Sequence, residues 1–515
     1  MTIKRYVAYK DNTLTNAYET NLTTRGTGSN MGLADSLEMF AIYAQANSSS
    51  NEQSRILLQF PVTTDDSGSF IAGTAIIDDR KADNIPESGS VNFYLRLFNV
   101  VHDQTVPSDF TLIVSPVSQS WEEGYGLDME NYSDLTYNGT GSNWMSASAT
   151  SGWVNDEDTA LTGGSYLSAS WMGSNSTRYN EFNYKKTVSN GISDLEIDIT
   201  GLVEQWILGT STTGYNNYGI GVHLTSSQAS GSRSYYTKKF SARNSEYIMK
   251  RPIIEARWDN SKKDKRGDFY ISSSALSSAN NLNILYLYNY VRGQPTDLAD
   301  VTGSRLLSVN IYVSASADQQ LTTTTEMPVT GGWVSTGVYS ASFALATSSS
   351  VVYDIWWSGS DDSAISNSGV RVFHTGSFKP KTFQSSNIYS IPRYITTITN
   401  LNSEYRSNDT TRLRLFTRLK DWSPTIYTKA SKEIENDFID DAYWKLYREI
   451  DEFEVVAYGT GSTKHTRLSY DVTGSYFDLD MKMLEANYSY VIKFVYYVNG
   501  QYQEQPEIFK FRVIE

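Results

Sequence analysis

The sequence of 515 residues contains no cysteine and only four histidines, and these shortages exclude several classes of chemistry. Without cysteine, the chain has no disulfides, thiolate metal ligands or thiol nucleophiles. His102, His223, His374 and His465 are dispersed along the chain without the spacing of a metallohydrolase or a Ser-His-Asp triad. No GxxxxGK[ST] phosphate loop occurs either. We therefore expect that the protein is not an enzyme.

Basic charge and long apolar runs are also scarce. Charged residues make up 19% of the chain, and the formal net charge is −14. Because non-specific binding to phosphates depends on clustered Lys and Arg, nucleic acid is not an expected partner. No apolar run reaches the roughly 18 residues that suggest a membrane span, and MTIKRYVAYKDN lacks the apolar centre of a signal peptide. We expect a protein made in the cytoplasm that does not insert into membranes.

The sequence is rich in aromatic residues and in residues that form turns. It contains 37 Tyr, 20 Phe and 11 Trp, and Ser, Thr, Asn and Gly clusters separate the β-branched and aromatic runs. This composition is typical of turn-rich sheets. At about 100–200 residues per domain, the length predicts about three domains. We predict an all-β fold, with a jelly-roll-like N-terminal sandwich followed by two smaller Ig-like antiparallel sandwiches.

The predicted N-terminal sandwich covers residues 1–258 and carries one short helix, TGLVEQWILG. Leu202, Val203, Trp206 and Ile207 fall on one side of this helix, with Thr200 as its N-cap and Gly209 as its stop. We expect Trp206 and its neighbours to close the end of the sandwich. The strands predicted before this helix are RYVAYKD, SRILLQFPV, SFIAGTAIID, SVNFYLRLFNVV and DFTLIVSPVSQSW. SRILLQFPV has apolar residues on both faces, which predicts a strand buried on both sides.

Residues 259–268 form a charged linker, which we interpret as a solvated hinge, the alternative being a binding patch. The second domain spans residues 269–380 and ends in a Pro-containing connection, HTGSFKPKTFQSSN. The third spans residues 388–515. Within it, EIENDFIDDAYWKLYREI fits a helix or a strand, and we favour a strand from about Ala442 with FEVVAYG as its hairpin-like partner.

Long loops between residues 121 and 172 hold four tryptophans, Trp121, Trp144, Trp153 and Trp171. Loops of this length are usually functional or packed against a neighbour. The four rings could form a platform on which a glycan stacks. Alternatively, they pin the loops to the sandwich, because large aromatic residues are mostly buried.

Two carboxylate clusters lie in the same loops, Glu122 with Glu123, and Asp156 with Glu157 and Asp158. The simplest interpretation is solvated acidic loops, with no cofactor. Asp156 and Asp158 are candidate calcium ligands, because that ion prefers oxygen ligands in polar loops. A catalytic pair would need two carboxyls about 5–10 Å apart across a cleft, which a sequence does not show.

The N-terminal half resembles a known module. The motifs that carry the resemblance are, in order, SNMGLADSLEMF, SRILLQF, SQSWEEG, SNWMSAS, SGWVNDED, LEIDITGLVEQWILG, NYGIGVHL and KRPIIEARW. They are similar to the DNRLRE-type β-sandwich module, a jelly roll related to one family of carbohydrate-binding modules. The resemblance implies a non-catalytic module of the kind found on surface and secreted proteins and on phage particles.

The C-terminal half is similar to virion proteins of tailed phages, particularly marine ones, in YNYVRGQPTDL, GVYSASF, HTRLSYDVTGSYFDLDMKML and FKFRVIE. Together the two resemblances predict a virion structural protein of the neck, tail or capsid exterior. Such a protein would be present in many copies or as a homo-oligomer, in contact with other virion proteins. The alternative function is recognition of a host-surface glycan.

Overall fold

A computed structural model describes most of the chain as two compact units. The described residues are all except 1, 64–74, 104–108, 128–130, 134–139, 169–181, 210–213, 233–234, 300, 302–305, 314–327, 347–349, 359–370, 383–391, 424 and 427–435. One unit contains residues 2–259 together with residues 461–465, and the other contains residues 260–460 and 466–515.

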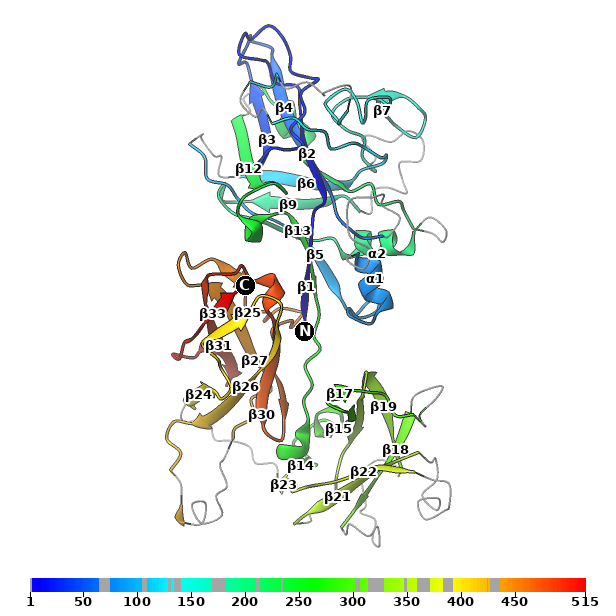
Figure 1. The fold of residues 1–515 in the computed structure, drawn as a ribbon, viewed down its shortest axis with the longest axis vertical. Coiled ribbons are helices and arrows are strands. Elements are labelled where there is room, and N and C mark those ends of the chain that lie inside the picture. The colour runs from blue at the N-terminus through cyan, green and yellow to red at the C-terminus, as the bar shows by residue number, and fades with distance from the viewer. Residues whose placement is uncertain are drawn as a thin grey trace. The chain divides into compact units, whose positions relative to one another are not determined.

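The first unit is built from two antiparallel sheets (Figure 1). The four-stranded sheet has the order β1 (Ile3–Val7), β13 (Ile253–Arg257), β5 (Asn92–Leu97) and β10 (Leu195–Asp198). The seven-stranded sheet has the order β12 (Tyr235–Ser241), β3 (Ser36–Tyr43), β4 (Asn51–Gln59), β11 (Ile220–Leu224), β6 (Phe110–Pro116) and β9 (Tyr184–Val188), with β2 (Lys10–Thr15) also paired to β4. Together with the sheets of the second unit, they confirm the all-β class.

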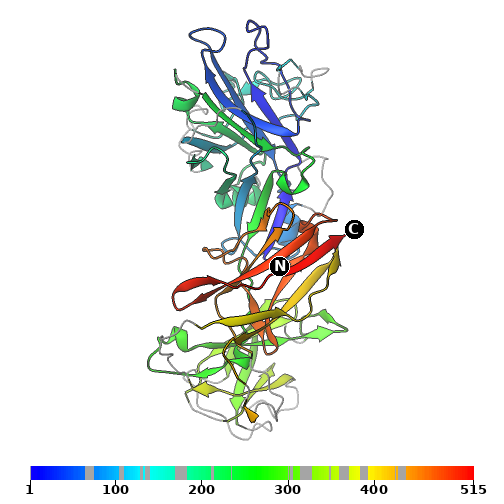
Figure 2. The same ribbon diagram turned by 90° about the vertical axis from the view of Figure 1, so that its left-hand side faces the viewer.

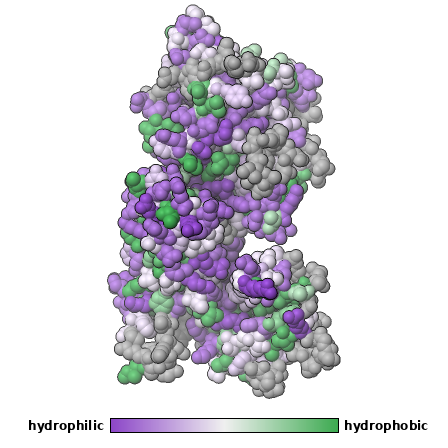
Figure 3. Space-filling model, in the orientation of Figure 1, coloured by the Kyte–Doolittle hydropathy of each residue, from purple (hydrophilic) through white to green (hydrophobic). Residues whose placement is uncertain are grey.

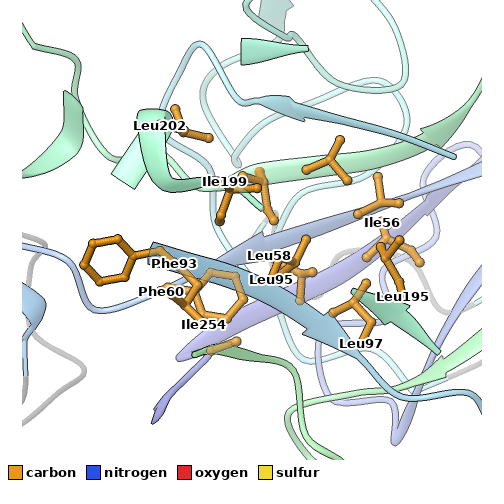
Figure 4. Packing of buried hydrophobic residues seen from close by; sticks show 14 of the residues in the cluster. Ile56, Leu58, Phe60, Phe93, Leu95, Leu97, Leu195, Ile199, Leu202 and Ile254 are labelled. Atoms are coloured by element: carbon orange, nitrogen blue, oxygen red, sulfur yellow. The ribbon is translucent and has the colours of Figure 1, made fainter. Parts of the chain in front are cut away.

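Strand β4 is buried on both faces, as its apolar run predicts. Ile56 and Leu58 point into the main core, where they join Phe60 from the end of the strand (Figure 4). That core also contains Phe93, Leu95 and Leu97 of β5, Leu195 of β10 and Ile254 of β13. Leu57 belongs to a second apolar cluster on the opposite face of the sheet. Both faces of this sheet are therefore covered.

The predicted helix exists as α2 (Thr200–Leu208), and its buried residues include Trp206 in the main core. Gly209 ends it with a φ of +65°, a conformation that glycine adopts without steric cost. The prediction that Thr200 is the N-cap is wrong, because the N-cap is Ile199. The Thr200 hydroxyl instead accepts a hydrogen bond from the Phe93 N–H at 2.9 Å, which ties the helix to β5.

Two further helices in the first unit correct the prediction of a single helix. The end of SFIAGTAIID, predicted as a strand, lies in α1 (Ile76–Lys81), and α3 (Ser226–Ala229) follows β11. Acidic residues in the first turn of α1 and basic residues in its last turn complement the helix dipole. Helices α1 and α2 lie side by side (Figure 1) and are joined by an ion pair between Arg80 and Glu204 at 2.8 Å.

The second unit contains the sheets of the two remaining expected domains. The first has a six-stranded antiparallel sheet in the order β15 (Asn283–Tyr288), β20 (Val338–Phe343), β19 (Val329–Ser335), β18 (Leu306–Tyr312), β21 (Val352–Trp357) and β22 (Val372–Phe378). Small ladders add β14 (Tyr270–Ile271) with β23 (Lys381–Thr382) and β16 (Tyr290–Val291) with β17 (Gln294–Pro295). The segment HTGSF, predicted to begin a connection, lies in β22 and pairs with β21.

The C-terminal part of this unit has two more sheets, whose long strands are seen in orange and red in Figure 2. One has the order β24 (Tyr394–Ile398), β26 (Thr410–Leu419), β30 (Gly474–Asp480) and β29 (Ser469–Asp471). The other has the order β25 (Glu404–Arg406), β33 (Phe509–Ile514), β31 (Ser489–Val498), β27 (Ala442–Arg448) and β28 (Glu454–Val456), with β32 (Gln501–Glu504) paired to β31. Strand β27 begins at Ala442 and pairs with β28, which confirms the strand interpretation and its hairpin partner.

The charged linker is not a solvated hinge. The Lys262 N–H donates to Ser469 Oγ at 3.0 Å, and Lys265 forms an ion pair with Asp440 at 3.0 Å. Arg266 holds the fully buried carboxylate of Asp354 with two bonds of 2.5 and 2.8 Å. A buried carboxylate requires such a partner, because desolvation of an unpaired charge is very costly. The linker is therefore packed into the second unit.

A buried polar cluster joins three distant segments of the first unit. Asp11 Oδ2 accepts the Arg243 N–H at 2.5 Å, and Glu123 Oε1 accepts the Asp11 N–H at 2.9 Å. The Arg243 guanidinium donates to both oxygens of Glu123 at 3.0 Å each. Asp11 Oδ1 is buried without a hydrogen-bond partner among the described residues. Burial raises the pKa of Asp11 to about 7, the neighbouring Glu123 adding to the effect.

We expect the Trp206→Ala variant to destabilise the first unit by about 3–5 kcal/mol, because it opens a cavity beneath α2. Calorimetry on the full chain measures this as a lower transition temperature for the first unit alone. Leu208→Ala, in the same helix but at a side chain that is 46% exposed, is the control and should cost far less. Equal losses in the two variants would contradict the packing of Trp206.

We expect the Asp11→Asn variant to become more stable relative to the parent as the pH rises. The raised pKa means that the folded parent keeps a proton which the unfolded chain has lost between about pH 4 and 7, so the parent loses stability over this window. The amide keeps an acceptor for Arg243 but does not ionise. The difference should grow from near zero at pH 4 to roughly 2–4 kcal/mol at pH 8 in urea titrations.

Asp11→Ala provides the control for this experiment. It also removes the ionisation, but it loses the acceptor for the Arg243 N–H, so it should show the same pH trend at lower stability. A parent and an Asp11→Asn variant that keep a constant stability difference from pH 4 to 8 would contradict the raised pKa.

Candidate functional site

The described loop residues at 121–127, 131–133 and 140–166 include several that pack onto the outer face of the seven-stranded sheet. Their aromatic side chains form one apolar cluster with residues of the strands beneath, and its members are Leu14, Leu57, Val117, Trp121, Trp144, Ala147, Trp153 and Tyr166. This cluster, which we call the outer cluster, is what buries the second face of β4. Loop residues, together with the short ladder of residues 153–154 and 160–161, thus supply a further layer of the fold.

Three of the four candidate tryptophans belong to the outer cluster. Trp121 donates its indole N–H to the Tyr218 carbonyl, and Trp153 donates to the Asn143 carbonyl, each at 2.9 Å. Trp144 lies under the Arg55 guanidinium, 4.8 Å from the ring centroid. The exposed fraction is 2% for Trp121, 6% for Trp144 and 0% for Trp153. Trp171 lies outside the described residues.

A sugar-stacking platform needs an exposed ring face, and Trp121, Trp144 and Trp153 offer none. The platform hypothesis is therefore wrong for these three residues. They pin the loops to the sandwich, which is the other role that the sequence suggests. The sequence did not separate the two roles, because both place aromatic residues in long polar loops.

The candidate carboxylates also have local roles. Asp156 and Asp158 are exposed, in the turn between β7 (Trp153–Val154) and β8 (Ala160–Leu161). Within the described part of the chain, no group of three His, Cys, Asp or Glu residues is arranged to hold a metal ion. Glu122 accepts the backbone N–H of Gly141 at 3.2 Å, and Glu123 pairs with Arg243. The pair Glu122–Glu123 thus fixes loops.

A hollow of about 310 Å³ opens on the outer side of the seven-stranded sheet, and we call it the sheet hollow. Its lining is mixed, with hydroxyl, amide, guanidinium and imidazole groups around apolar side chains. The lining residues are Phe40, Gln53, Ser54, Arg55, Ile113, Ser168, Asn183, His223, Leu224, Ser226, Ala229 and Ser230.

The sheet hollow exists because β4 changes its partner along its length. Residues 51–53 of β4 pair with β3, whereas Ile56, Leu57 and Leu58 pair with β11, and β2 runs along β4 from Ser54 to Gln59. Ser54 bridges the resulting split, since its Oγ accepts the Phe40 N–H at 2.9 Å and donates to the Glu38 carbonyl at 2.8 Å. Backbone groups of β3 that lose their ladder partner are satisfied in this way.

His223 of β11 is held neutral in the wall of the sheet hollow. Burial, together with the nearby Arg55 guanidinium, lowers the pKa of His223 to about 4. Its Nδ1 lies 2.9 Å from the Leu224 carbonyl and its Nε2 lies 3.4 Å from Ser115 Oγ. A carbonyl needs a donor, so Nδ1 carries the proton and Nε2 is the unprotonated ring nitrogen.

The Ser115–His223 pair does not form a nucleophilic dyad. Ser115 is fully buried, and its hydroxyl donates to Asn183 Oδ1 at 2.5 Å, much closer than to the imidazole. A nucleophile must be accessible to a substrate and must lose its proton to the base. The sheet hollow can therefore bind a small, uncharged polar molecule through hydrogen bonds, but its described groups supply no acid–base or nucleophilic chemistry.

Little in the sequence indicates this hollow. Its lining comes from six segments between residues 40 and 230, and the signal that was available is the single imidazole in the apolar strand IGVHL. The ring nitrogens of this histidine lie near the Leu224 carbonyl and Ser115 Oγ. The split between β3 and β11 beside β4 has no local sequence mark.

No family model and no curated protein matches the chain. Among solved structures, it is similar to fibronectin(III)-like modules of Clostridium thermocellum CbhA, with 10% identity over 50% of this chain and 91% of that one, at a TM-score of 0.14. A chimeric titin Z1Z2 functionalised with a decorin peptide matches with 10% identity over 46% of this chain and 89% of its own, at the same TM-score of 0.14. Likenesses at such scores carry no argument about function.

We expect Trp153→Ala to lower the stability of the first unit by about 3–5 kcal/mol, because the ring is fully buried and its N–H has a buried acceptor. Urea unfolding measures this loss. Met145→Ala is the control in the same loop region, at a side chain that is 50% exposed, and should change stability by less than about 1 kcal/mol. A fully stable Trp153→Ala variant would contradict the pinning role.

Proposed function

We propose that this protein is a structural component of a tailed-phage virion, present in multiple copies and held by contacts with other virion proteins. The observation that carries the proposal is the outer cluster, because the residues best suited to a ligand site are used to build the fold. The loops of residues 121–166 act as a packed layer, as a protein with a mechanical role requires. The motif resemblances of both halves add the phage context.

The exposed surface suits repeated contacts between folded subunits. Apolar side chains occur as small separate groups on the face seen in Figure 3. Several exposed aromatic side chains are tyrosines, which supply a large rigid contact area with a polar end. They are Tyr125, Tyr235, Tyr247, Tyr290, Tyr497 and Tyr502.

The edge strand β9 shows how one sheet avoids uncontrolled association. Lys185, Lys186 and Thr187 are exposed along it. Lysines on an edge strand disfavour pairing with another edge, because the pairing would bury or juxtapose their charges. Assembly at this edge would have to use side-chain contacts in place of backbone pairing. The faces of the sheet and the loops are then the surfaces available to bind partner proteins.

Electron microscopy of purified particles tests the virion proposal. We expect density for both units at a defined symmetric position, and mass spectrometry should detect the chain in particles at a fixed ratio to the capsid protein. Particles of the encoding phage that lack the chain, while infected cells contain it in soluble form, would contradict the proposal.

Glycan recognition is a second candidate function, and the sheet hollow is the observation that favours it. Amide and hydroxyl groups around an apolar floor match the mixed surface of a sugar, and the volume is within the range of small-ligand pockets. In this candidate function, Gln53 and Asn183 would carry the recognition, and the buried tryptophans would take no part in it.

A glycan array with matched variants tests this second candidate. If a glycan binds in the sheet hollow, Gln53→Ala should weaken binding by about tenfold, because one lost hydrogen bond is worth roughly 1 kcal/mol and a buried partner is left unpaired. Lys186→Ala on the neighbouring edge strand should leave binding unchanged. No binding to any neutral glycan would remove this candidate and leave the structural proposal intact.

A further inference from the structure

A second hollow in the first unit has a different chemical character. Its volume is about 520 Å³, and most of its exposed lining is polar. The lining residues are Val7, Ala8, Tyr9, Glu123, Arg243, Asn244 and Arg251. We call it the arginine hollow, because two guanidinium groups line it.

One of these guanidinium groups is neutralised within the protein. Arg243 donates from Nε and Nη2 to the two oxygens of Glu123, at 3.0 Å each. This bidentate pairing fixes the plane of the guanidinium and cancels the charge of both groups. In the part of the chain that the structure describes, Nη1 of Arg243 has no hydrogen-bond acceptor.

The second guanidinium is positioned but not neutralised. Arg251 is half-buried, and its Nε donates to the Ser245 carbonyl at 3.0 Å, which orients the side chain over its own loop. Among the described residues, no carboxylate lies within ion-pairing distance of Arg251. The Nη groups of Arg251 therefore have no negatively charged partner within the described part of the chain.

The local charge of the arginine hollow is therefore positive. Glu123 and Arg243 cancel, and Arg251 leaves one positive charge. Burial of Asp11, which holds the backbone of Arg243, favours its neutral form and so weakens the opposing charge. A cation would be repelled from this hollow, whereas an anion would gain a partner without breaking an existing ion pair.

We propose that the arginine hollow binds an oxyanion, namely a carboxylate, sulfate or phosphate group carried by a small ligand. Arg251 presents both Nη groups, which match two oxygens of such a group in a planar fork. Asn244 and Nη1 of Arg243 supply further donors at the wall. The activity goes beyond virion assembly and is independent of the sheet hollow.

The hydrogen bonds that Arg251 and Asn244 already make indicate which of these donors contributes more to anion binding. The Nε bond to Ser245 restricts the rotation of Arg251, so less side-chain entropy is lost on binding. Asn244 is a weaker contributor, because its amide also contacts the Gly32 carbonyl at 3.4 Å. Val7, which is 40% exposed, offers an apolar contact for the uncharged part of the ligand.

Calorimetric titration of the full chain with sodium phosphate, sodium sulfate and sodium glucuronate tests the proposal. The titrations are run at one constant ionic strength, because exposed charges are screened by salt. We expect at least one of the three anions to bind with a stoichiometry of one per chain. The anion that binds most tightly identifies the kind of oxyanion.

Four variants identify the site. Arg251→Gln should weaken binding by at least tenfold, and Arg251→Lys, which keeps the charge but loses the fork, by a smaller factor. Asn244→Ala should weaken binding slightly and tests the site should the Arg251 variants fail to fold. Lys186→Gln, which removes one exposed positive charge from the same unit, should bind like the parent.

Two outcomes would overturn the proposal. The first is the absence of binding by all three anions. The second is binding that is equally reduced in Arg251→Gln and Lys186→Gln, since this would show a general effect of net charge. Loss of binding in Arg251→Gln alone, with an unchanged circular dichroism spectrum, supports it.

Discussion

The burial of strand β4 on both faces is the constraint on which the first unit depends. Ile56 and Leu58 require one apolar partner layer, and Leu57 requires another on the opposite face. The four-stranded sheet supplies the first layer. The second is supplied by loops, and their tryptophans are consequently committed to packing. A strand that reads as continuously apolar therefore decides the role of residues almost a hundred positions away.

Covering a sheet with loops creates a need for polar partners. Loops contain many backbone groups without a ladder partner, and buried ones must be hydrogen-bonded. The indole N–H groups of Trp121 and Trp153 satisfy two loop or turn carbonyls, and Arg55 donates to the Gly163 carbonyl at 2.6 Å. The residues that fill the outer cluster thus also satisfy its backbone. The sheet hollow lies where the loop residues no longer cover the outer face of the seven-stranded sheet.

Buried carboxylates in both units are paired with guanidinium groups. Glu255 of β13 is buried, and burial by itself raises its pKa. The guanidinium groups of Arg5, Arg96 and Arg257 outweigh that effect and hold the pKa of Glu255 well below its usual range. Arg266 similarly secures the buried Asp354 in the second unit. Arg251 differs from these groups, because no carboxylate among the described residues pairs with its guanidinium.

The sequence by itself determined the elements that depend on local periodicity. The apolar run of β4, the helix that ends at Gly209 and the strand from Ala442 were all predictable, because side-chain spacing sets which face is buried. The class followed from composition. The helix α1 was missed, since its short apolar start resembles a strand and its dipole-matched charges are a weaker signal.

Only the tertiary structure decided which loop residues are buried, where the sheet splits and which charges remain unpaired. Trp121, Trp144 and Trp153 have the same sequence context whether they stack on a sugar or pack on a sheet. The split beside Ser54 arises because β3 and β11 pair with different stretches of β4, and the arginine hollow arises from segments that meet only after folding. These features depend on contacts between residues far apart in the chain, which local propensity and spacing do not encode.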